Sequence, residues 1–209
     1  MLGASLLAAA LLLGVAIRSV MLRLDAPPDA RVDEGWIKVD RAVDLPPAPE
    51  PARNAATLAG VDANANGVRD DVERRIAEAH GLHSERAEAL RRTAMTVQGA
   101  IAVGGQLWLA SEQGRQPAIG ADDLQRVREQ SALAGACVLK TFGADYDEAG
   151  RQSGDAALRA IVEQLLDTQA RQYAYALVMP LTQDPVSLQQ QQPLFFLNPC
   201  DGLLRSMQR

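Results

Sequence analysis

The chain has 209 residues, of which 47% are hydrophobic and only 4% aromatic, and its formal net charge at pH 7 is −5. An acidic chain without a clustered basic segment lacks the positive surface that neutralises phosphates, so the composition argues against a nucleic-acid-binding protein. Ala and Leu dominate while aromatic residues are few, which favours helices over sheets and predicts an all-α fold.

Residues 1–24 begin with an uncharged apolar run, MLGASLLAAALLLGVAI, which has about the length of a signal-peptide core and is short for a membrane-spanning helix. No Lys or Arg precedes this run, whereas Arg18 and Arg23 follow it, and small residues before position 17 offer a weak cleavage site after Ala16. A cleaved signal peptide and an uncleaved membrane anchor therefore both stay open. Either one predicts an exported protein, periplasmic or anchored to the inner membrane and facing the periplasm.

Residues 25–53 form a Pro-rich linker or strap. Six prolines in this span are incompatible with a continuous helix and favour extended polyproline geometry. Within it, the alternation in WIKVDRAV, from Trp36 to Val43, predicts one short strand-like piece. The remaining residues, 54–209, are predicted to fold as one helical domain of ordinary size.

The stretch DANANGVRDDVE, residues 62–73, places polar residues at the offsets of a calcium-binding loop. A calcium ion takes about seven oxygen ligands, so alternating side chains at positions 1, 3 and 5 point inward and Gly67 at position 6 allows the sharp turn. Position 7 supplies a backbone carbonyl, position 9 acts directly or through water, and position 12 closes the shell with both carboxylate oxygens. The predicted ligands are Asp62, Asn64, Asn66, Val68, Asp70 and Glu73.

This loop resembles the EF-hand-type calcium loop and is similar to the Asp-rich loops of thrombospondin type-3-like repeats. The resemblance covers twelve residues and implies one bound Ca²⁺. Arg69 stands at position 8, where paired sensor loops usually have an aliphatic residue, and the short PARNAATLAG before the loop leaves little room for an entering helix. We therefore expect a structural ion that fastens the Pro-rich strap to the following helix. The alternative is a plain Asn-Gly turn in which Asp70 or Asp71 caps the helix.

With only three carboxylates in the shell, the affinity is expected near the range of about 10⁻⁴ to 10⁻³ M found for extracellular modules. Mg²⁺ is a poorer fit because it requires a small octahedron and retains waters. Asp71, at position 10, is expected to point away from the ion.

About four helices are predicted to pack as a small bundle. The first runs to His80 and stops before Gly81, the second is N-capped by Ser84 and continues toward Ala110, and the third covers 121–143. The fourth, from about 155 to 178, has the clearest 3.6-residue repeat and is expected to end before Pro180, after a polar segment GADYDEAGRQSG that breaks the helical pattern. Gly99, Gly104 and Gly105 in the second helix either admit another helix closely or break this helix in two.

Cys137 and Cys200 are the only cysteines, an even count in a chain predicted to be exported. A disulfide between them and a pair of buried thiols both stay open. A bridge would pin the C-terminal tail, whose apolar Phe195, Phe196 and Leu197 are expected to pack back, onto the third helix.

Other candidate sites are weaker. His80 and His83 have a His-x-x-His spacing with Gly81 between them and no evident third ligand, so a helix cap beside a loop histidine is favoured over a metal site. The carboxylates of residues 144–150 are read as a solvated loop.

The sequence thus predicts a calcium-binding, non-enzymatic protein. A protein-interaction role, such as an inhibitor or immunity-type protein, and an enzyme whose site assembles only in the fold remain as alternatives.

Overall fold

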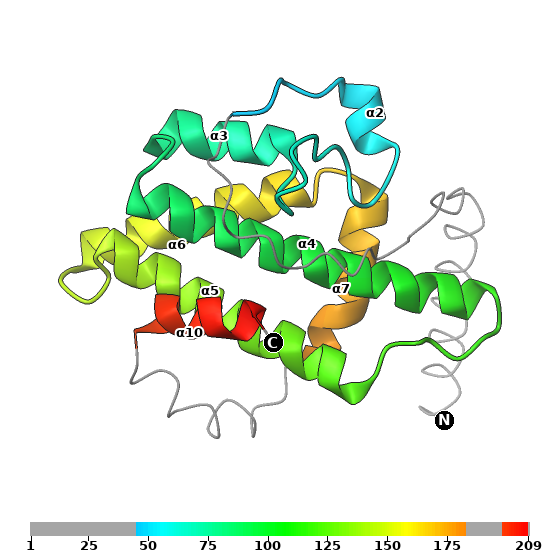
Figure 1. Ribbon diagram of the computed structural model, residues 1–209. Helices are drawn as coiled ribbons and strands as arrows, with labels where there is room; N and C mark the ends of the chain where they lie inside the picture. Colours follow the sequence, from blue (N-terminus) through cyan, green and yellow to red (C-terminus); the bar gives the residue numbers. More distant parts are fainter. Residues whose placement is uncertain (1–44, 183–197, 209) are drawn as a thin grey trace, which may run out of the picture.

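A computed structural model describes residues 45–182 and 198–208 of the chain. All regular secondary structure in these residues is helical, which confirms the predicted all-α class (Figure 1). The predicted signal or anchor segment, residues 1–24, and the strand-like piece at 36–43 lie outside the described residues. The helices are α2 (Pro51–Ala55), α3 (Asp70–His80), α4 (Glu85–Glu112), α5 (Ala121–Phe142), α6 (Glu148–Leu165), α7 (Gln169–Thr182) and α10 (Pro199–Met207).

Helix α4 lies at the centre of the arrangement and packs against α3, α5, α6 and α7 (Figure 1). It begins as predicted, because the Ser84 hydroxyl accepts a hydrogen bond from the backbone N–H of Ala87 at 3.0 Å and so satisfies one of the unpaired donors of the first turn. The main hydrophobic core forms between these helices, and each contributes fully buried side chains to it. They include Val72, Ile76, Leu90, Ile101, Val138, Ile161, Leu165 and Ala174.

The glycines of α4 allow another helix to approach closely, and they do not break α4. The helix continues from Glu85 to Glu112 through all three glycines. A Cβ atom placed on Gly104 would lie 1.8 Å from the carbonyl oxygen of Ala174 on α7, far inside any permitted contact distance. Glycine at this position therefore sets how closely α4 and α7 cross.

The helix predicted over 155–178 was wrong in extent, because the structure has two helices there. Helix α6 already begins at Glu148, since the Asp147 carboxylate caps it by accepting the backbone N–H of Gly150 at 2.6 Å. It ends at Leu165, and Thr168 starts α7 by accepting the N–H of Arg171 at 3.3 Å. The apolar repeat runs on across this corner because both helices bury one face against α4, so periodicity alone could not reveal the break.

Pro180 also lies inside α7, which continues to Thr182, so the prediction that this proline ends the helix was wrong. A proline near a helix end removes one backbone hydrogen bond but still has the φ angle that a helix requires.

The end of the Pro-rich segment is helical as well. Helix α2 begins at Pro51, where a missing N–H costs nothing, and the Glu50 carboxylate accepts the N–H groups of Ala52 and Arg53 at 2.9 and 2.7 Å. The prediction of extended structure through residue 53 is therefore corrected by this single turn. Residues 45–50 have no regular structure, and the carbonyl of Pro46 accepts a hydrogen bond from Arg74 of α3 at 2.9 Å.

The C-terminal helix α10 packs along α5, which is the third of the predicted helices. The sulfur atoms of Cys137 and Cys200 lie at disulfide distance, 2.14 Å apart. A separate apolar cluster joins the two helices, and the Gln130 side chain of α5 donates to the carbonyl of Ser206 at 3.3 Å. The tail residues 195–197 lie outside the described residues.

Reduction of this disulfide is expected to lower the free energy of unfolding by about 4 kcal/mol, because the bond closes a loop of 63 residues in the unfolded chain. Thermal unfolding of the full chain with and without a phosphine reductant measures the loss, and Cys200→Ser should reproduce it. Equal melting temperatures, together with a thiol titration that finds two accessible thiols only after reduction, would contradict this expectation.

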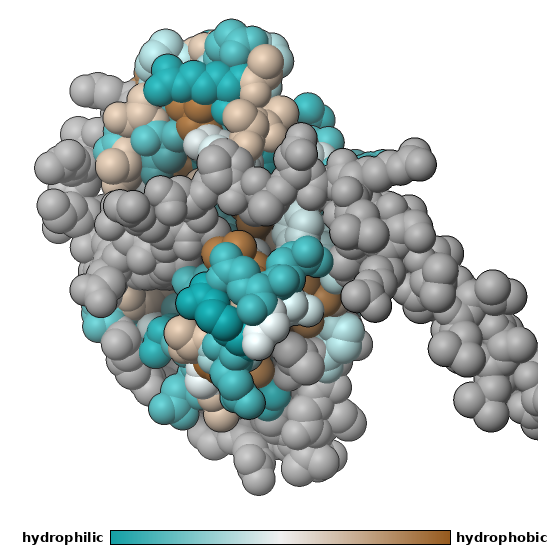
Figure 2. Space-filling view, turned by 90° about the vertical axis from the view of Figure 1, so that its right-hand side faces the viewer, coloured by the Kyte–Doolittle hydropathy of each residue, from teal (hydrophilic) through white to brown (hydrophobic). Residues whose placement is uncertain are grey.

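The surface of the described residues offers little apolar area. Leu45 and Tyr146 are the only large hydrophobic side chains among them that are exposed, and Tyr146 stands in the loop between α5 and α6. Figure 2 shows hydrophilic residues over much of the coloured surface on one side of the molecule, with hydrophobic residues visible between them. No helix within residues 45–182 or 198–208 combines the length and apolar character needed to cross a bilayer.

Candidate metal centre

The predicted loop 62–73 consists of a turn, residues 62–69, followed by the first turn of α3, residues 70–73 (Figure 1). Two residues adopt positive φ angles, Ala65 at 54° and Gly67 at 84°. Glycine adopts this conformation readily, so position 6 of the loop has the residue that its turn requires. A substitution at Gly67 would be strained whatever the space around it.

The Asp62 carboxylate holds the turn together. One of its oxygens accepts the N–H of Asn66 at 3.2 Å and the other accepts that of Gly67 at 2.8 Å. Asn64 Oδ1 also accepts the N–H of Asn66 at 3.2 Å, and Asn66 Oδ1 accepts that of Val68 at 2.9 Å. The side chains at positions 1, 3 and 5 are thereby all turned toward the interior of the loop.

Glu73, at position 12, is the residue on which the loop converges. It is fully buried in the first turn of α3, although it carries a carboxyl group. Asn66 Nδ2 donates to its Oε1 at 2.8 Å, and Asn64 Nδ2 donates to its Oε2 at 3.1 Å. Three of the six predicted ligands therefore meet at one point, and both oxygens of Glu73 face the loop.

Asp70 and Val68 occupy the other predicted positions. Asp70 is buried, and one of its carboxylate oxygens accepts the N–H of Ala63 at 2.9 Å while its own N–H donates to the carbonyl of Val61 at 2.9 Å. Neither Asp70 nor Asp71 caps α3 through its side chain, so the helix-cap alternative for these residues is not what the structure has. The Val68 side chain is buried in the main core, which anchors the middle of the loop.

The environment of the loop disfavours the charged forms of two carboxyl groups, those of Asp62 and Glu73. Burial raises the pKa of Glu73; hydrogen bonds from Asn64 and Asn66 counteract this only in part, and the nearby Asp62 carboxylate raises the pKa further. Burial also raises the pKa of Asp62, again despite backbone hydrogen bonds that lower it, and the charge of Asp70 adds to the effect. Raised carboxyl pKa values mean that the negative charges disfavour one another and their burial, which a bound cation would offset.

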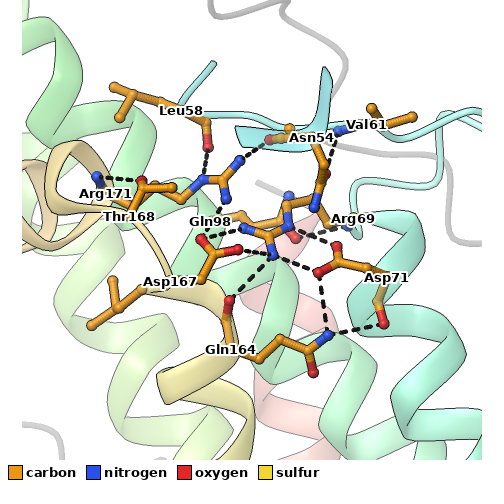
Figure 3. A network of polar contacts seen from close by, with 12 residues as sticks. Asn54, Leu58, Val61, Arg69, Asp71, Gln98, Gln164, Asp167, Thr168 and Arg171 are labelled. Atoms are coloured by element: carbon orange, nitrogen blue, oxygen red, sulfur yellow. Dashed lines mark hydrogen bonds and ion pairs between the residues drawn. The ribbon is translucent and has the colours of Figure 1, made fainter. Parts of the chain in front are cut away.

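A network of two buried arginines and two partly exposed carboxylates beside the loop was not predicted from the sequence (Figure 3). Arg69, at position 8, points away from the loop interior and its guanidinium group pairs with Asp71 at 2.6 Å and with Asp167 at 2.9 Å. Asp167 pairs in turn with Arg171 of α7. Arg69 and Arg171 are fully buried. Arg69, the residue that departs from the sensor-loop pattern, is therefore a buried side chain. The sequence signals were the unusual residue at position 8 and the i,i+4 spacing of Asp167 and Arg171.

The prediction that Asp71 points away from the predicted ion agrees with its pairing with Arg69. The other candidates lie apart from the loop. His80 is the last residue of α3. Its ring packs edge-on against the Phe142 ring, with centroids 5.4 Å apart. Among the polar residues 144–150, Asp147 caps α6. Within the part of the chain that the structure describes, no group of three or more His, Cys, Asp or Glu side chains has the arrangement of a metal site, and this includes the loop carboxylates Asp62, Asp70 and Glu73.

Comparison of the chain with protein-family models, with curated proteins and with solved structures found no match. The loop 62–73 is therefore the feature of the chain that indicates a function.

Asp71 gives the loop region a pH dependence that can be measured. Burial raises the pKa of its carboxyl, but the hydrogen bond and the charge of Arg69 together lower it by more. A carboxyl with a lower pKa in the folded protein stabilises the fold above its unfolded pKa of about 3.9, and this stabilisation is lost as the pH falls through the folded value. In calcium-free buffer at pH 7, we expect Asp71→Asn to cost about 2 kcal/mol in free energy of unfolding.

Urea unfolding of wild type and Asp71→Asn across a pH series tests the sign. The difference between the two proteins should be constant above about pH 5 and shrink as the pH falls toward and below about 3.9. A difference that does not change with pH would mean that the charge of Asp71 contributes nothing.

Proposed function

We propose that the protein binds one calcium ion in the loop 62–73 and that the ion is structural. The observation that carries this proposal is the convergence of Asn64 and Asn66 on both carboxylate oxygens of the buried Glu73, beside the Asp62 carboxylate. These side chains, the Asp70 carboxylate and the Val68 carbonyl would hold the ion. Seven oxygen donors, two of them from Glu73, suit Ca²⁺ better than Mg²⁺, which prefers a small octahedron.

The arrangement of the donors also supports the fit. Asn64 and Asn66 direct their amide groups at Glu73, where rotation of each amide would exchange a donor N–H for an oxygen ligand. The three carboxylates Asp62, Asp70 and Glu73 would supply the negative charge, and the raised pKa values of Asp62 and Glu73 indicate charge that a cation can compensate.

We further propose an exported, non-enzymatic protein, periplasmic or anchored to the inner membrane through residues 1–24. The apolar run in those residues and the pairing of the two cysteines support this. In this proposal the longer helices form a small bundle, and the Pro-rich segment 25–53 is a strap that the calcium loop and Arg74 help to fasten.

Calcium calorimetry on the full chain tests the proposal, with thermal unfolding in calcium and in chelator as the second measurement. A ligand that binds only the folded state raises the melting temperature. We expect saturable binding near the range of about 10⁻⁴ to 10⁻³ M and a higher melting temperature in calcium, with a smaller effect of Mg²⁺ at equal concentration. Identical melting curves in calcium and in chelator, with no binding heat, would refute the proposal.

A further inference from the structure

Arg171 on α7 fixes the segment that leads into the predicted calcium loop. Its guanidinium group is fully buried and donates to the backbone carbonyls of Thr57 at 2.9 Å and Leu58 at 3.1 Å, and to that of Asn54 (Figure 3). Three backbone carbonyls of residues 54–58 thus accept hydrogen bonds from one arginine side chain. A buried carbonyl left without a donor is costly, so the conformation of this segment depends on Arg171.

The same segment sets the start of the loop. The Asn54 side chain accepts the N–H of Val61 at 3.0 Å, directly before Asp62, and the Thr57 hydroxyl accepts the N–H of Gly60 at 3.0 Å. The position of the first predicted ligand therefore follows from the residues that Arg171 holds.

Arg69 fixes the other side of the loop. It stands between the carbonyl ligand at position 7 and the carboxylate at position 9, and its N–H donates to Gln98 Oε1 on α4 at 2.9 Å. Its guanidinium group reaches Asp167 through two hydrogen bonds of 3.2 and 2.9 Å and the carbonyl of Gln164 at 3.2 Å. Both flanks of the loop are therefore tied to the corner between α6 and α7, and Asp167 is shared by the two arginines.

We propose that Arg69, Asp167 and Arg171 are positioning residues for the calcium loop, so that calcium affinity depends on the α6–α7 corner even though none of the three is a predicted ligand. This inference rests on the proposed function. If a rigid corner holds the ligands in their binding arrangement, loosening it adds an ordering cost to calcium binding. Because coupling between sites is reciprocal, calcium should also rigidify the corner.

Calcium calorimetry on full-length variants, at a temperature where each is folded, tests this inference. Asp167→Asn is the main variant, because the Asp167 side chain is 36% exposed and tolerates the change better than a buried arginine. Arg171→Met removes all the donors, and Arg171→Lys keeps the charge and part of the hydrogen bonding. The matched control is Arg151→Met, which breaks an exposed pair with Glu148 on α6.

We expect Asp167→Asn and Arg171→Met each to weaken calcium affinity by about tenfold, Arg171→Lys to recover part of that loss, and Arg151→Met to leave the affinity unchanged. A second readout is hydrogen exchange of residues 164–172, which should slow when calcium binds to wild type. If Arg171→Met does not fold, Asp167→Asn and Arg171→Lys decide the question.

The outcomes separate this inference from the function on which it rests. Wild-type affinity in Asp167→Asn and Arg171→Lys, with lower melting temperatures in chelator, would mean that the network only stabilises the fold, and it would overturn the inference alone. A wild-type protein that binds no calcium would overturn the proposed function as well.

Discussion

Glu73→Gln is expected to abolish the rise in melting temperature that the proposed calcium binding produces, while leaving the stability of the calcium-free protein close to that of wild type. In calcium, the substitution removes the predicted bidentate ligand at position 12. Without calcium, it replaces a buried group whose pKa is raised, and whose charged form is therefore disfavoured, by a neutral amide. The Nε2 group of that amide cannot accept the hydrogen bond that one of the two Asn side chains donates, and this loss offsets the gain.

The size of the lost response follows from mass action. At a calcium concentration 100 times the dissociation constant, binding to the folded state alone stabilises it by about 2.7 kcal/mol. Thermal and urea unfolding of Glu73→Gln should show almost none of this difference between calcium and chelator.

The matched control is Glu78→Gln on the same helix, where the side chain is 68% exposed and pairs only loosely with Arg74 at 3.9 Å. It should respond to calcium as wild type does. A Glu73→Gln protein that keeps the full calcium response would exclude position 12 from the shell, whereas strong destabilisation in chelator would show that the Glu73 charge stabilises the empty loop.

Gly104→Ala is expected to have the largest effect on stability among single substitutions in the helices. Its Cβ would lie 1.8 Å from the Ala174 carbonyl oxygen and 2.5 Å from the carbonyl carbon, both backbone atoms of a buried turn of α7. Only a shift of one whole helix can relieve the overlap, so we expect a loss of about 3 kcal/mol or more in the free energy of unfolding. Urea unfolding in saturating calcium measures it.

Gly135→Ala on α5 is the control for the intrinsic preference of alanine over glycine in a helix. A Cβ at Gly135 meets no atom within 4 Å, so this variant should gain about 0.5 to 1 kcal/mol. If Gly104→Ala also stabilised the protein, the close crossing of α4 and α7 would be refuted.

Helix boundaries that depend on local capping could be predicted from the sequence. Ser84 before α4 and the glycine after α3 each act through the backbone of the adjoining turn, so neighbouring residues suffice to locate them. The start of α6 was missed because Asp147 looked like one acid among several in a polar segment. The corner after Leu165 was missed because the apolar repeat continues through it.

The predicted calcium loop could be located because its ligands lie within twelve residues. The network behind it could not, since Arg69 and Asp167 are separated by 98 residues and a sequence does not reveal which distant charges meet. Arg69 was noticed only as a departure at position 8. Its role depends on α6 and α7 folding back across the loop, which is a property of the tertiary structure.

The order in which the parts of this network are synthesised has a consequence for folding. Arg171 follows Leu58, whose carbonyl it holds, by 113 residues, so the segment before the loop emerges from the ribosome long before its partner exists. The chain must complete α7 before that segment can take its final conformation. We therefore expect the segment before the loop to reach its final conformation only after α7 has folded.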